Sequence, residues 1–528
     1  MKRASLRACA GPLGVVALLA GLAAPACGSG SSAPIFTGDT PPSPANDGGA
    51  PPVLTAGCVG FQCSVGTCPG GGTTSIRGTV YDPAGTDPLY NVVVYVPASP
   101  PGPITTGATC DSCSSLYSGG AVAAAVTDAT GAFSIKNVPA GNSIPLVVQI
   151  GKWRKQTTVE TVTACTKNPI KPVTLPSNHT EGDIPSIAIS TGGADSLECL
   201  LLRIGVDPTE YASGTLGAGR IHIFQGSAPS TVPYGAATTT PQAPKSSEAL
   251  WSSLANLMPY DITILSCEGA ETVDQPGSVP LKASDQENLF EYAVAGGRVF
   301  ASHFHYAWFA SGPFAAENIA TWTIGANPIT DATNNPVESE QGDFIYANVV
   351  TSLPNGSAFP KGQLLAQWLG NVGALELPGE PAPGEVEIQG AKHNADLAGV
   401  PNTPSQAWIA ADQNAQTEII FDPGEDAGTP VSAAGATEYL SFNTPVDAGL
   451  DDAGQPAYCG RVVYSDLHVG AASQDYGGQG AGGVVPDGCA NNALSPQEKV
   501  LEFMLFDLSS CVTPDTGPAQ APVPPPIH

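Results

Sequence analysis

The period of the apolar residues changes near residue 183, and this change constrains the fold more than any other feature. Between residues 75 and 175, short runs alternate apolar and polar residues and are separated by Gly, Pro and Asp, a pattern typical of antiparallel strands. From residue 183 onwards, strand-like runs alternate with runs whose apolar residues recur every three or four positions. The sequence therefore predicts a multi-domain chain, in which an antiparallel β-sandwich precedes an α/β domain with a mostly parallel sheet.

The predicted sandwich covers residues 75–175. Its segments GTVYDPAG and TDATGAFSIKNVPAG, with the strand after them, resemble the carboxypeptidase regulatory-like domain, a transthyretin-like β-sandwich. The resemblance implies a module that supports or presents a neighbouring domain and is not itself catalytic. No attached peptidase is expected, because the sequence contains no HxxE, HExxH or GxSxG motif.

The α/β domain is predicted over residues 183–512. Helix candidates lie near 197–204, 250–257 and 284–295, and the last one begins at Ser495, where Pro496 suits the first turn and Glu498 completes a capping box. The strand candidates between these helices are IPSIAIST, GRIHIF, YDITILSC, RVFAS and GRVVYS. This alternation predicts a sheet with helices on both faces, which the last helix closes.

Residues 306–458 form a predicted insertion that is long and rich in Gly and Pro. It contains one helix candidate near 364–368 and the strand-like runs VEIQG, QAWIAA, TEIIFD and TEYLSF. We expect it to lie over the carboxyl edge of the sheet. The tracts DPGEDAG and VDAGLDDAG lack EF-hand spacing and are interpreted as linkers. A Pro-rich tail is predicted at 513–528.

Four groups able to bind a metal or move a proton follow two predicted strands. His303 and His305 come after RVFAS, and Asp466 and His468 come after GRVVYS. Residues two apart in an extended strand point to one face, so all four are predicted to converge at the carboxyl edge of the sheet as catalytic groups. His303, His305 and His468 would be the ligands of a possible divalent metal. The alternative is that these histidines are packed in the core.

Other polar and aromatic residues are predicted to lie next to this site. Cys267 and Glu268 end the third strand, and Asp195 lies near the start of the first helix. Tyr306 and Trp308 follow His305 directly and are predicted to form an aromatic platform on which a sugar can stack.

The runs YDITILSCEG, GGRVFASHFHYAWF and GRVVYSDLHVG resemble class I glutamine-amidotransferase-like domains, especially their ThuA-like branch associated with sugar utilisation. His303 falls near the histidine of the ThuA-like pattern GLHAA, and GRVVYSDLH matches an ending of the type GRVFYTTLGH. The resemblance covers roughly 183–305 and 459–512, and it implies a flavodoxin-like fold more firmly than any activity.

The sequence departs from the amidotransferase triad at two of its three positions. Ser302 and His303 stand where the catalytic cysteine belongs, and Gly470 stands two residues beyond His468 where a glutamate belongs. Glutamine hydrolysis is therefore not expected. Cys267 ends the preceding strand and not the elbow, so it is interpreted as a structural half-cystine or a leftover thiol.

The first 27 residues have the layout of a secretory signal. Lys2, Arg3 and Arg7 precede an apolar run over 13–23, which is too short for a permanent membrane helix, and small residues then lead to Cys27. The segment 22–27 resembles a bacterial lipobox, although Ala24 replaces the usual leucine. We expect lipidation of Cys27 and a cell-envelope location, outer-membrane or cell-surface; the alternative is ordinary cleavage and a secreted or periplasmic protein.

Residues 28–74 are predicted to form a flexible tether and a Cys-rich neck, because Gly, Ser and Pro predominate. No later segment is apolar enough to cross a membrane, so contact with one is expected only through the lipid anchor.

The charge of the chain limits its partners. The chain has 19 basic and 47 acidic residues, and removal of the signal, which holds three basic residues and no acidic one, leaves a net charge of −31. Such a charge argues against nucleic acid, whereas a glycan, cations or envelope proteins remain possible partners. Lys152, Arg154 and Lys155 form one basic cluster, interpreted as protection of an edge strand or as a grip for an anionic glycan.

Eleven of the thirteen cysteines lie beyond Cys27. Six fall before residue 170 and five after it, which predicts three disulfides in the first group and two in the second, with one free thiol. The pair Cys110 and Cys113 has CxxC spacing, interpreted as a loop staple in preference to a redox centre.

Two functions follow from these predictions. The first is a non-catalytic cell-envelope lipoprotein with a degenerate amidotransferase-like domain, which binds carbohydrate or another protein. The alternative is a ThuA-like sugar-active or metal-assisted hydrolase that uses His303, His305, Asp466 and His468. Metal binding distinguishes the two.

Overall fold

The computed structural model describes residues 60–213, 219–227, 244–269, 281–323, 329–330, 344–379, 382–417, 431–451, 454, 456–469 and 493–523. All of these belong to one compact unit, which spans residues 52–528. The predicted signal, Cys27 and most of the predicted tether lie outside the described residues. Within the described part of the chain, no helix is long and apolar enough to cross a membrane.

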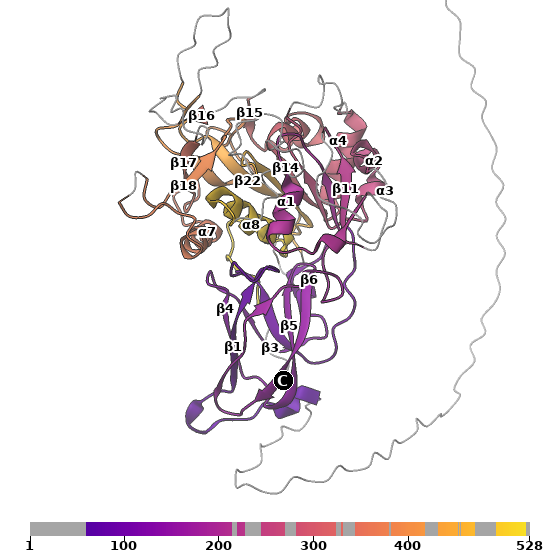
Figure 1. The fold of residues 1–528 in the computed structure, drawn as a ribbon, viewed down its shortest axis with the longest axis vertical. Helices are drawn as coiled ribbons and strands as arrows, with labels where there is room; N and C mark the ends of the chain where they lie inside the picture. Colours follow the sequence, from indigo (N-terminus) through magenta and orange to yellow (C-terminus); the bar gives the residue numbers. More distant parts are fainter. Residues whose placement is uncertain are drawn as a thin grey trace, which may run out of the picture. The chain divides into compact units, whose positions relative to one another are not determined.

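The first eight strands form two four-stranded sheets (Figure 1). One has the order β4-β1-β7, with β8 also on β1, and the other has the order β3-β2-β5-β6. Every pair in the second sheet is antiparallel, but β7 and β8 run parallel to β1, so antiparallel pairing was wrong for these two short strands. The strands are β1 Ser75–Tyr81, β2 Val93–Pro97, β3 Ala121–Val126, β4 Ala132–Lys136, β5 Gly141–Ile150, β6 Trp153–Val162, β7 Lys167–Pro169 and β8 Val173–Thr174.

The two sheets share one apolar core. Ile76 and Val80 of β1 and Val94 and Val96 of β2 are fully buried in it, as the two-residue period predicts for residues on one face of a strand. The same cluster continues without a break into the core of the larger part of the molecule.

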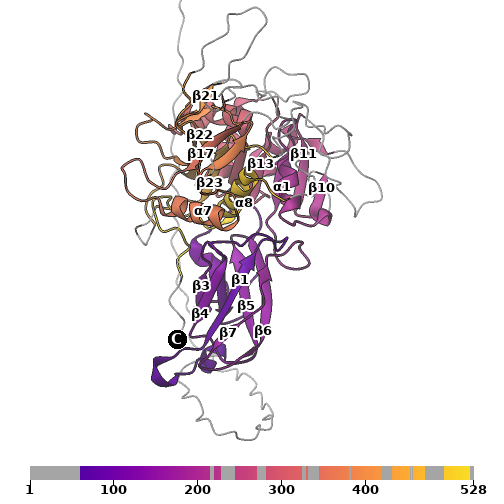
Figure 2. The same cartoon turned by 60° about the vertical axis from the view of Figure 1, so that its left-hand side comes forward.

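The larger part is built on one eleven-stranded sheet (Figure 2). Its parallel half has the order β10-β11-β9-β13-β14-β23, and β12 also pairs with β11. Without the short β10 and β12, these strands, numbered by their order in the chain, follow one another across the sheet as 2-1-3-4-5. These strands are β9 Ile187–Ser190, β10 Tyr211–Ser213, β11 Ile221–Gln225, β12 Lys245–Ser246, β13 Ile262–Leu265, β14 Arg298–Ser302 and β23 Gly460–Ser465.

The insertion extends this same sheet, and the prediction that it lies over the carboxyl edge was wrong for its main strands. Beyond β23 the order continues as β22-β20-β17-β18, all antiparallel. Strand β22 pairs with the whole length of β23, from Tyr439 opposite Ser465 to Thr444 opposite Gly460. These strands are β17 Phe344–Val349, β18 Val386–Gln389, β20 Gln406–Ala411 and β22 Thr437–Thr444. Two short pairs accompany them: β15 Thr321–Trp322 with β19 Ala395–Asp396, and β16 Ile329–Thr330 with β21 Gln416–Thr417.

Helices cover both faces of the sheet, as predicted. Ile187 and Ile189 of β9 pack into the core cluster that contains α1 and α8, whereas Ala188 between them belongs to the cluster that contains α2, α3 and α4. The predicted helix near 250–257 is divided in two, because the first piece ends at its C-cap Ser252 and the next residue, Ser253, caps the second piece through the Ala255 amide. The helices are α1 Leu197–Arg203, α2 Glu248–Trp251, α3 Leu254–Leu257, α4 Ala283–Val294, α5 Ala307–Ala310, α6 Gly312–Ala315, α7 Pro360–Asn371 and α8 Pro496–Ser509.

Helix α8 joins the two parts of the molecule. It begins with the predicted capping box of Ser495 and Glu498. The ring of Phe503 stacks on Tyr90, with centroids 4.2 Å apart, and the Tyr90 hydroxyl donates to Asp507 at 2.6 Å. Since α8 also packs on the large sheet, it is buried between that sheet and the first eight strands.

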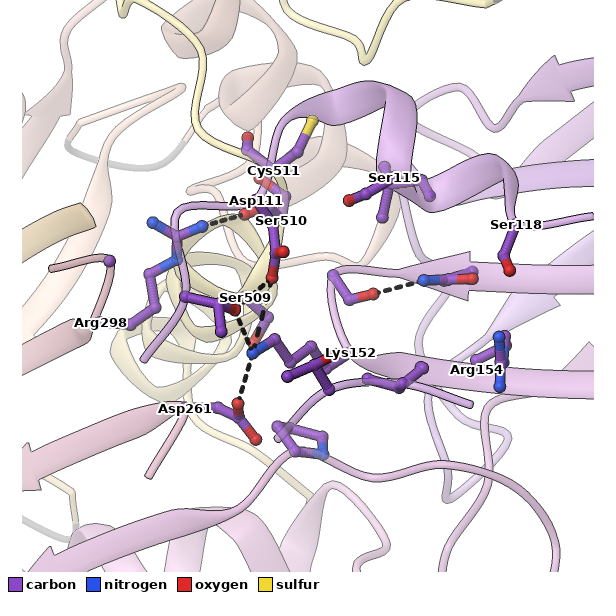
Figure 3. A pocket seen from close by; sticks show the side chains of 18 of the residues that line it. Asp111, Ser115, Ser118, Lys152, Arg154, Asp261, Arg298, Ser509, Ser510 and Cys511 are labelled. Atoms are coloured by element: carbon purple, nitrogen blue, oxygen red, sulfur yellow. Dashed lines mark hydrogen bonds and ion pairs between the residues drawn. The ribbon is translucent and has the colours of Figure 1, made fainter. Parts of the chain in front are cut away.

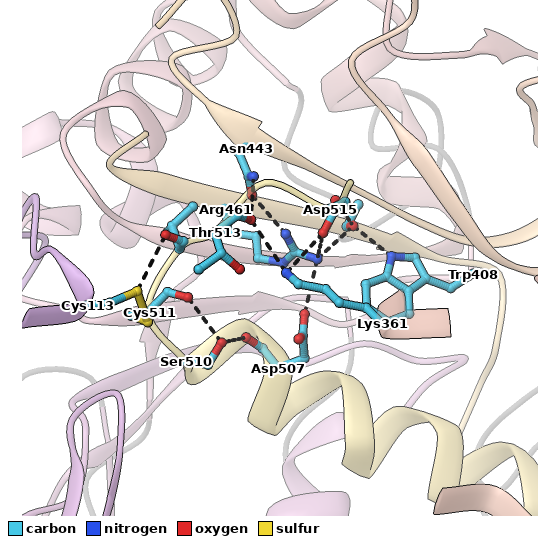
Figure 4. Close-up of polar contacts among 12 residues, drawn as sticks. Cys113, Lys361, Trp408, Asn443, Arg461, Asp507, Ser510, Cys511, Thr513 and Asp515 are labelled. Atoms are coloured by element: carbon cyan, nitrogen blue, oxygen red, sulfur yellow. Dashed lines mark hydrogen bonds and ion pairs between the residues drawn. A yellow bond between two sulfur atoms is a disulfide. The ribbon is translucent and has the colours of Figure 1, made fainter. Parts of the chain in front are cut away.

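A buried ionic network fixes the carboxyl end of α8 to the sheet (Figure 4). The guanidinium of Arg461 on β23 lies 3.1 Å from Asp507 and 2.9 Å from Asp515, and Lys361 of α7 lies 3.2 Å from Asp515. Burial opposes ionisation of Asp515, but Arg461 and Lys361 together hold its pKa below the usual value. The first part of the predicted Pro-rich tail is thus an ordered part of the core.

Two disulfides cross between the two groups of cysteines, so the predicted pairing within each group was wrong for these and correct for Cys68–Cys165. Cys68 bonds to Cys165, but Cys110 bonds to Cys459 and Cys113 bonds to Cys511. Cys63 and Cys199 are disulfide-bonded as well. The two cysteines of the CxxC pair thus fasten one loop to two distant segments, as expected of a staple and not of a redox pair. Sequence spacing cannot fix such connectivity, because it depends on which loops meet in the fold.

We expect non-reducing peptide mapping to find these cross-links. Each of Cys110 and Cys113 should appear in a peptide joined to a segment more than 300 residues away, since the sequence separations are 349 and 398. Cleavage between Cys110 and Cys113 is needed to separate the two links. A Cys110–Cys113 disulfide in the oxidised protein would contradict this topology.

Glu502 of α8 is an uncompensated acid at the seam between the two parts. It is fully buried, and no cationic side chain of the described residues forms an ion pair with it. Burial, and then the nearby Asp82 and Asp87, raise the pKa of Glu502 well above its usual value. Because the folded pKa is raised, the stability of the wild type falls as the pH rises through that value.

Glu502→Gln should therefore stabilise the protein at pH 8, by on the order of 1–3 kcal/mol, and have little effect at pH 4, where both side chains are neutral. Denaturant unfolding at the two pH values measures this. Glu498→Gln is the matched control on the same helix; it loses an ion pair with Arg203 and should destabilise at pH 8. Equal effects of Glu502→Gln at both pH values would disprove the electrostatic explanation.

Candidate functional site

The site lies where β13, β14 and β23 end. Strand β14 ends at Ser302, and His303 then adopts a φ of +43°, a left-handed conformation that a residue with a side chain seldom takes. The Tyr464 hydroxyl oxygen lies 3.0 Å from the His303 carbonyl oxygen, beside this turn. The sharp turn directs the His303 side chain across the ends of the neighbouring strands, where Cys267 and His468 lie.

Cys267, His303 and His468 form a compact cluster of possible metal ligands. One ligand atom from each lies within 4.8 Å of the others. The Cys267 Sγ is 3.2 Å from the His303 Nδ1, and the two imidazole rings are 5.0 Å apart at their centroids. All three residues are buried, with 0%, 2% and 6% of their surface exposed.

Two nitrogens of this cluster lack partners. The Nε2 atoms of His303 and His468 are buried and make no hydrogen bond of good geometry within the described part of the chain, although the Asn394 side chain lies near enough to His303 to oppose the lowering of its pKa. Buried polar atoms without a partner are rare in native proteins, so each needs an explanation. Two imidazole rings beside a thiol are the donor set that a soft or borderline transition metal prefers.

The electrostatics of the cluster also suit a cation. Burial, with a smaller contribution from Lys392, lowers the pKa of His468 to about 3, and burial, then His468, lowers the pKa of His303 well below 6.5. Burial raises the pKa of the Cys267 thiol to about 12. The free site therefore holds neutral imidazoles, which are competent ligands, and a neutral thiol that a metal ion would deprotonate.

Asp195 holds the two chain segments that carry His303 and His468. Its carboxylate accepts a hydrogen bond from the Ser302 hydroxyl at 2.6 Å and another from the Val469 amide at 2.8 Å. It thus ties the residue before His303 to the residue after His468. Burial raises the pKa of Asp195 to about 7. The sequence predicted that Asp195 lies near the site, and in the structure it connects the segments that carry His303 and His468.

His305 is not part of the cluster. Its Nε2 donates to the Ser266 carbonyl at 2.9 Å, and its Nδ1 accepts from the Trp308 indole at 3.0 Å, so both nitrogens are occupied. The prediction assumed that the strand continues to residue 305. The chain instead turns into a 3₁₀ helix at His303–Tyr306, which points His303 and His305 in different directions.

The predicted aromatic platform is also absent from the surface. Tyr306 is 1% exposed and Trp308 is fully buried, and Trp308 packs edge-on against Trp251 at 5.2 Å. Both belong to the core beneath the sheet, where a sugar cannot stack on them.

Asp466 lies beside the cluster and serves the fold. It accepts a hydrogen bond from the Tyr464 hydroxyl at 2.6 Å and another from the Asn394 amide at 3.3 Å. Burial raises its pKa to about 7. The Asp466 amide in turn donates to the carbonyl of Glu438 on β22 at 2.8 Å.

Sequence reasoning missed Glu438 and undervalued Cys267. Glu438 is fully buried, neither carboxylate oxygen has a partner among the described residues, and burial, then Asp466, raises its pKa. In the sequence it is one polar residue in the strand-like run TEYLSF, and nothing marks it. Cys267 is the free cysteine of the described chain, so its reading as the leftover thiol is confirmed.

No protein-family model matches the chain, and no curated protein matches it. Solved structures with limited similarity include two described as putative ThuA-like proteins. One, from Bacteroides uniformis, is 9% identical over 61% of this chain and 89% of its own, with a TM-score of 0.27. The other, from Parabacteroides merdae, is 11% identical over 64% and 92%, with a TM-score of 0.24.

A cohesin–X-dockerin complex from Acetivibrio cellulolyticus contains a chain that is 16% identical over 25% of this chain and 85% of its own, with a TM-score of 0.15. Identities and TM-scores of this size do not establish a family or a function for the chain.

Metal binding at pH 6 should release about one proton per ion. The pKa shifts mean that both histidines are already neutral at this pH and only the Cys267 thiol has a proton to lose. Calorimetric titration of Zn²⁺ in buffers with different ionisation enthalpies measures the number. Release of two or more protons would show that the histidines are charged in the free protein and that burial does not lower their pKa values as stated.

Proposed function

We propose that this chain is an exported cell-envelope protein, lipid-anchored at Cys27, whose ThuA-like α/β domain binds a transition-metal ion through Cys267, His303 and His468. The convergence of these three side chains, with two imidazole nitrogens left without partners, is the observation that carries the proposal. The lipid anchor rests on the sequence of the first 27 residues, and the remaining parts of the proposal rest on the fold and on the disulfides.

Two features support the ThuA-like, flavodoxin-like assignment and the location. The strand order 2-1-3-4-5 agrees with a flavodoxin-like sheet, and the eight strands before it agree with a transthyretin-like sandwich that braces this sheet. Disulfides such as Cys68–Cys165 form and persist in oxidising compartments, which supports export.

The donor set favours zinc or copper. A thiolate sulfur and two imidazole nitrogens are typical ligands of Zn²⁺ and of copper, whereas Ca²⁺ and Mg²⁺ require oxygen ligands. Three protein ligands leave one position of a tetrahedral site for a further ligand.

Glutaminase chemistry is not supported. The left-handed turn that would carry a nucleophilic cysteine carries His303 instead. The thiol of Cys267 is fully buried, with a pKa raised to about 12, so it is not a thiolate at neutral pH.

Binding without catalysis remains our first proposal, with a glycan or an envelope protein as the partner. Metal-assisted hydrolysis is the second, and the buried Glu438 carboxyl favours it as a candidate general acid or base, because neither of its oxygens has a hydrogen-bond partner among the described residues. A hydrolytic activity that requires both the metal and Glu438 would establish the second proposal over the first.

Elemental analysis tests the metal site. After dialysis against trace Zn²⁺ and Cu²⁺, the purified chain from residue 28 onwards should retain about one ion per molecule. Cys267→Ala, His303→Ala and His468→Ala should each lower the affinity by about 100-fold or more, since each removes one of three ligands.

His222→Gln is the matched control. His222 is a half-buried histidine of the same sheet, whose nitrogens contact the Tyr260 hydroxyl at 2.9 Å and the Gly219 carbonyl at 3.1 Å. This variant should keep its metal. Circular dichroism without metal checks that each variant is folded. Folded variants at Cys267, His303 and His468 that retain the ion as the control does would refute the site.

A further inference from the structure

A second possible site lies at the opposite ends of the same strands. A pocket of about 160 Å³ opens where loop 103–118, the start of β6 and the end of α8 meet the first residues of β13 and β14 (Figure 3). Ile262 and Arg298 line it and are the first residues of those strands, whereas Cys267 and His303 follow their last residues. The pocket is therefore separate from the metal cluster.

The walls of this pocket are built by close backbone contacts. A Cβ at Gly107 would lie 2.4 Å from the Met258 carbonyl oxygen, one at Gly151 would lie 1.7 Å from that of Ser509, and one at Gly296 would lie 2.2 Å from that of Thr109. Only glycine permits such approaches. The Cys110–Cys459 and Cys113–Cys511 disulfides fasten the same loop, so the pocket is formed before any ligand enters.

Most charges in the pocket already neutralise one another. Lys152 lies 2.7 Å from Asp261 and 3.6 Å from Asp111, and it also donates to the Gly107 carbonyl. Arg154 pairs with Asp183 at 2.8 Å. These residues therefore contribute little net charge to the pocket. Each residue of the predicted basic cluster, Lys152, Arg154 and Lys155, forms an ion pair with a carboxylate of the same chain.

Arg298 is the exception. It donates to the carbonyls of Cys459 at 2.9 Å and Ser510 at 3.3 Å, and no carboxylate of the described chain lies within 4.0 Å of its guanidinium. Burial, followed by the positive charge of Arg461, lowers the pKa of Arg298 to about 10. A guanidinium has five N–H donors, so several remain for an anion.

The other polar groups of the lining suit hydroxyl groups on a ligand. The Gln149 side chain is 5% exposed, and its Oε1 accepts no hydrogen bond from any described residue. The Ser509 hydroxyl donates to the Leu505 carbonyl, so its oxygen can still accept a hydrogen bond from a ligand. The Ser118 hydroxyl accepts from the Gly102 amide, so it can still donate one.

We propose that this pocket binds a small hydroxylated carboxylate, such as a single sugar-acid ring, with the carboxylate on Arg298 and hydroxyl groups on Gln149, Ser118 and Ser509. The volume of the pocket, about 160 Å³, agrees with such a ligand, because a cavity of about 150 Å³ holds one six-membered ring. The open side of the pocket leaves room for substituents of the ring. This ligand site does not depend on the metal proposal.

Calorimetric titration with D-glucuronate and with D-glucose tests the site on the whole chain from residue 28 onwards. The two sugars differ in the carboxylate, so glucuronate should bind at least about tenfold more tightly than glucose. Arg298→Met should remove this preference. Ser115→Phe, at an exposed residue of the lining, should block both sugars without touching Arg298.

Lys155→Met is the matched control, since Lys155 belongs to the same basic cluster but does not line the pocket. It should bind glucuronate like the wild type. Thermal unfolding confirms that each variant is folded, and Ser115→Phe keeps the test decisive if Arg298→Met does not fold. Equal binding of the two sugars, no binding of glucuronate, or binding that Ser115→Phe leaves unchanged would each overturn the proposal.

Discussion

The structure depends on the burial of helix α8 from all sides. Its apolar residues occur around the whole helix, and even Glu502 and Asp507 are enclosed. A helix of this kind is stable only when other elements cover every face. The large sheet covers one side and the first eight strands cover another, where Tyr90 stacks on Phe503. The two parts therefore share one core.

This shared core makes the large sheet a rigid support with two different ends. At the amino ends of its parallel strands, the disulfide-fastened loop 103–118 and the end of α8 enclose a polar pocket. At the carboxyl ends, the strands bring together Cys267, His303 and His468. Asp195 holds the carboxyl ends together, because it bonds to Ser302 beside His303 and to Val469 beside His468. A site fixed in this way is preorganised for its ligand, at little entropic cost on binding.

Local patterns predicted much of the fold. The strand and helix periods located the five central strands, and the capping box at Ser495 marked the start of α8 correctly, because these signals depend on neighbouring residues. Long-range features were not predictable. The crossing disulfides and the antiparallel extension by β22 arise from which segments meet in space, and no local signal records that.

The site was predicted only in part, for a physical reason. His303 and His468 were placed together correctly by the topology of parallel strands. His305 was misassigned because β14 ends three residues earlier, and the 3₁₀ turn that follows sends its side chain to Ser266 and Trp308. The thiol of Cys267 was recognised as unpaired, but its contact with His303 depends on the left-handed turn, which a sequence with no glycine there does not reveal.

The most direct test of the central claim is the X-ray absorption spectrum of the protein loaded with one equivalent of Zn²⁺. We predict a first shell with one sulfur at about 2.3 Å and two imidazole nitrogens at about 2.0–2.1 Å, with any remaining ligand a light atom. A shell of oxygen and nitrogen alone, without sulfur, would contradict a site built from Cys267, His303 and His468.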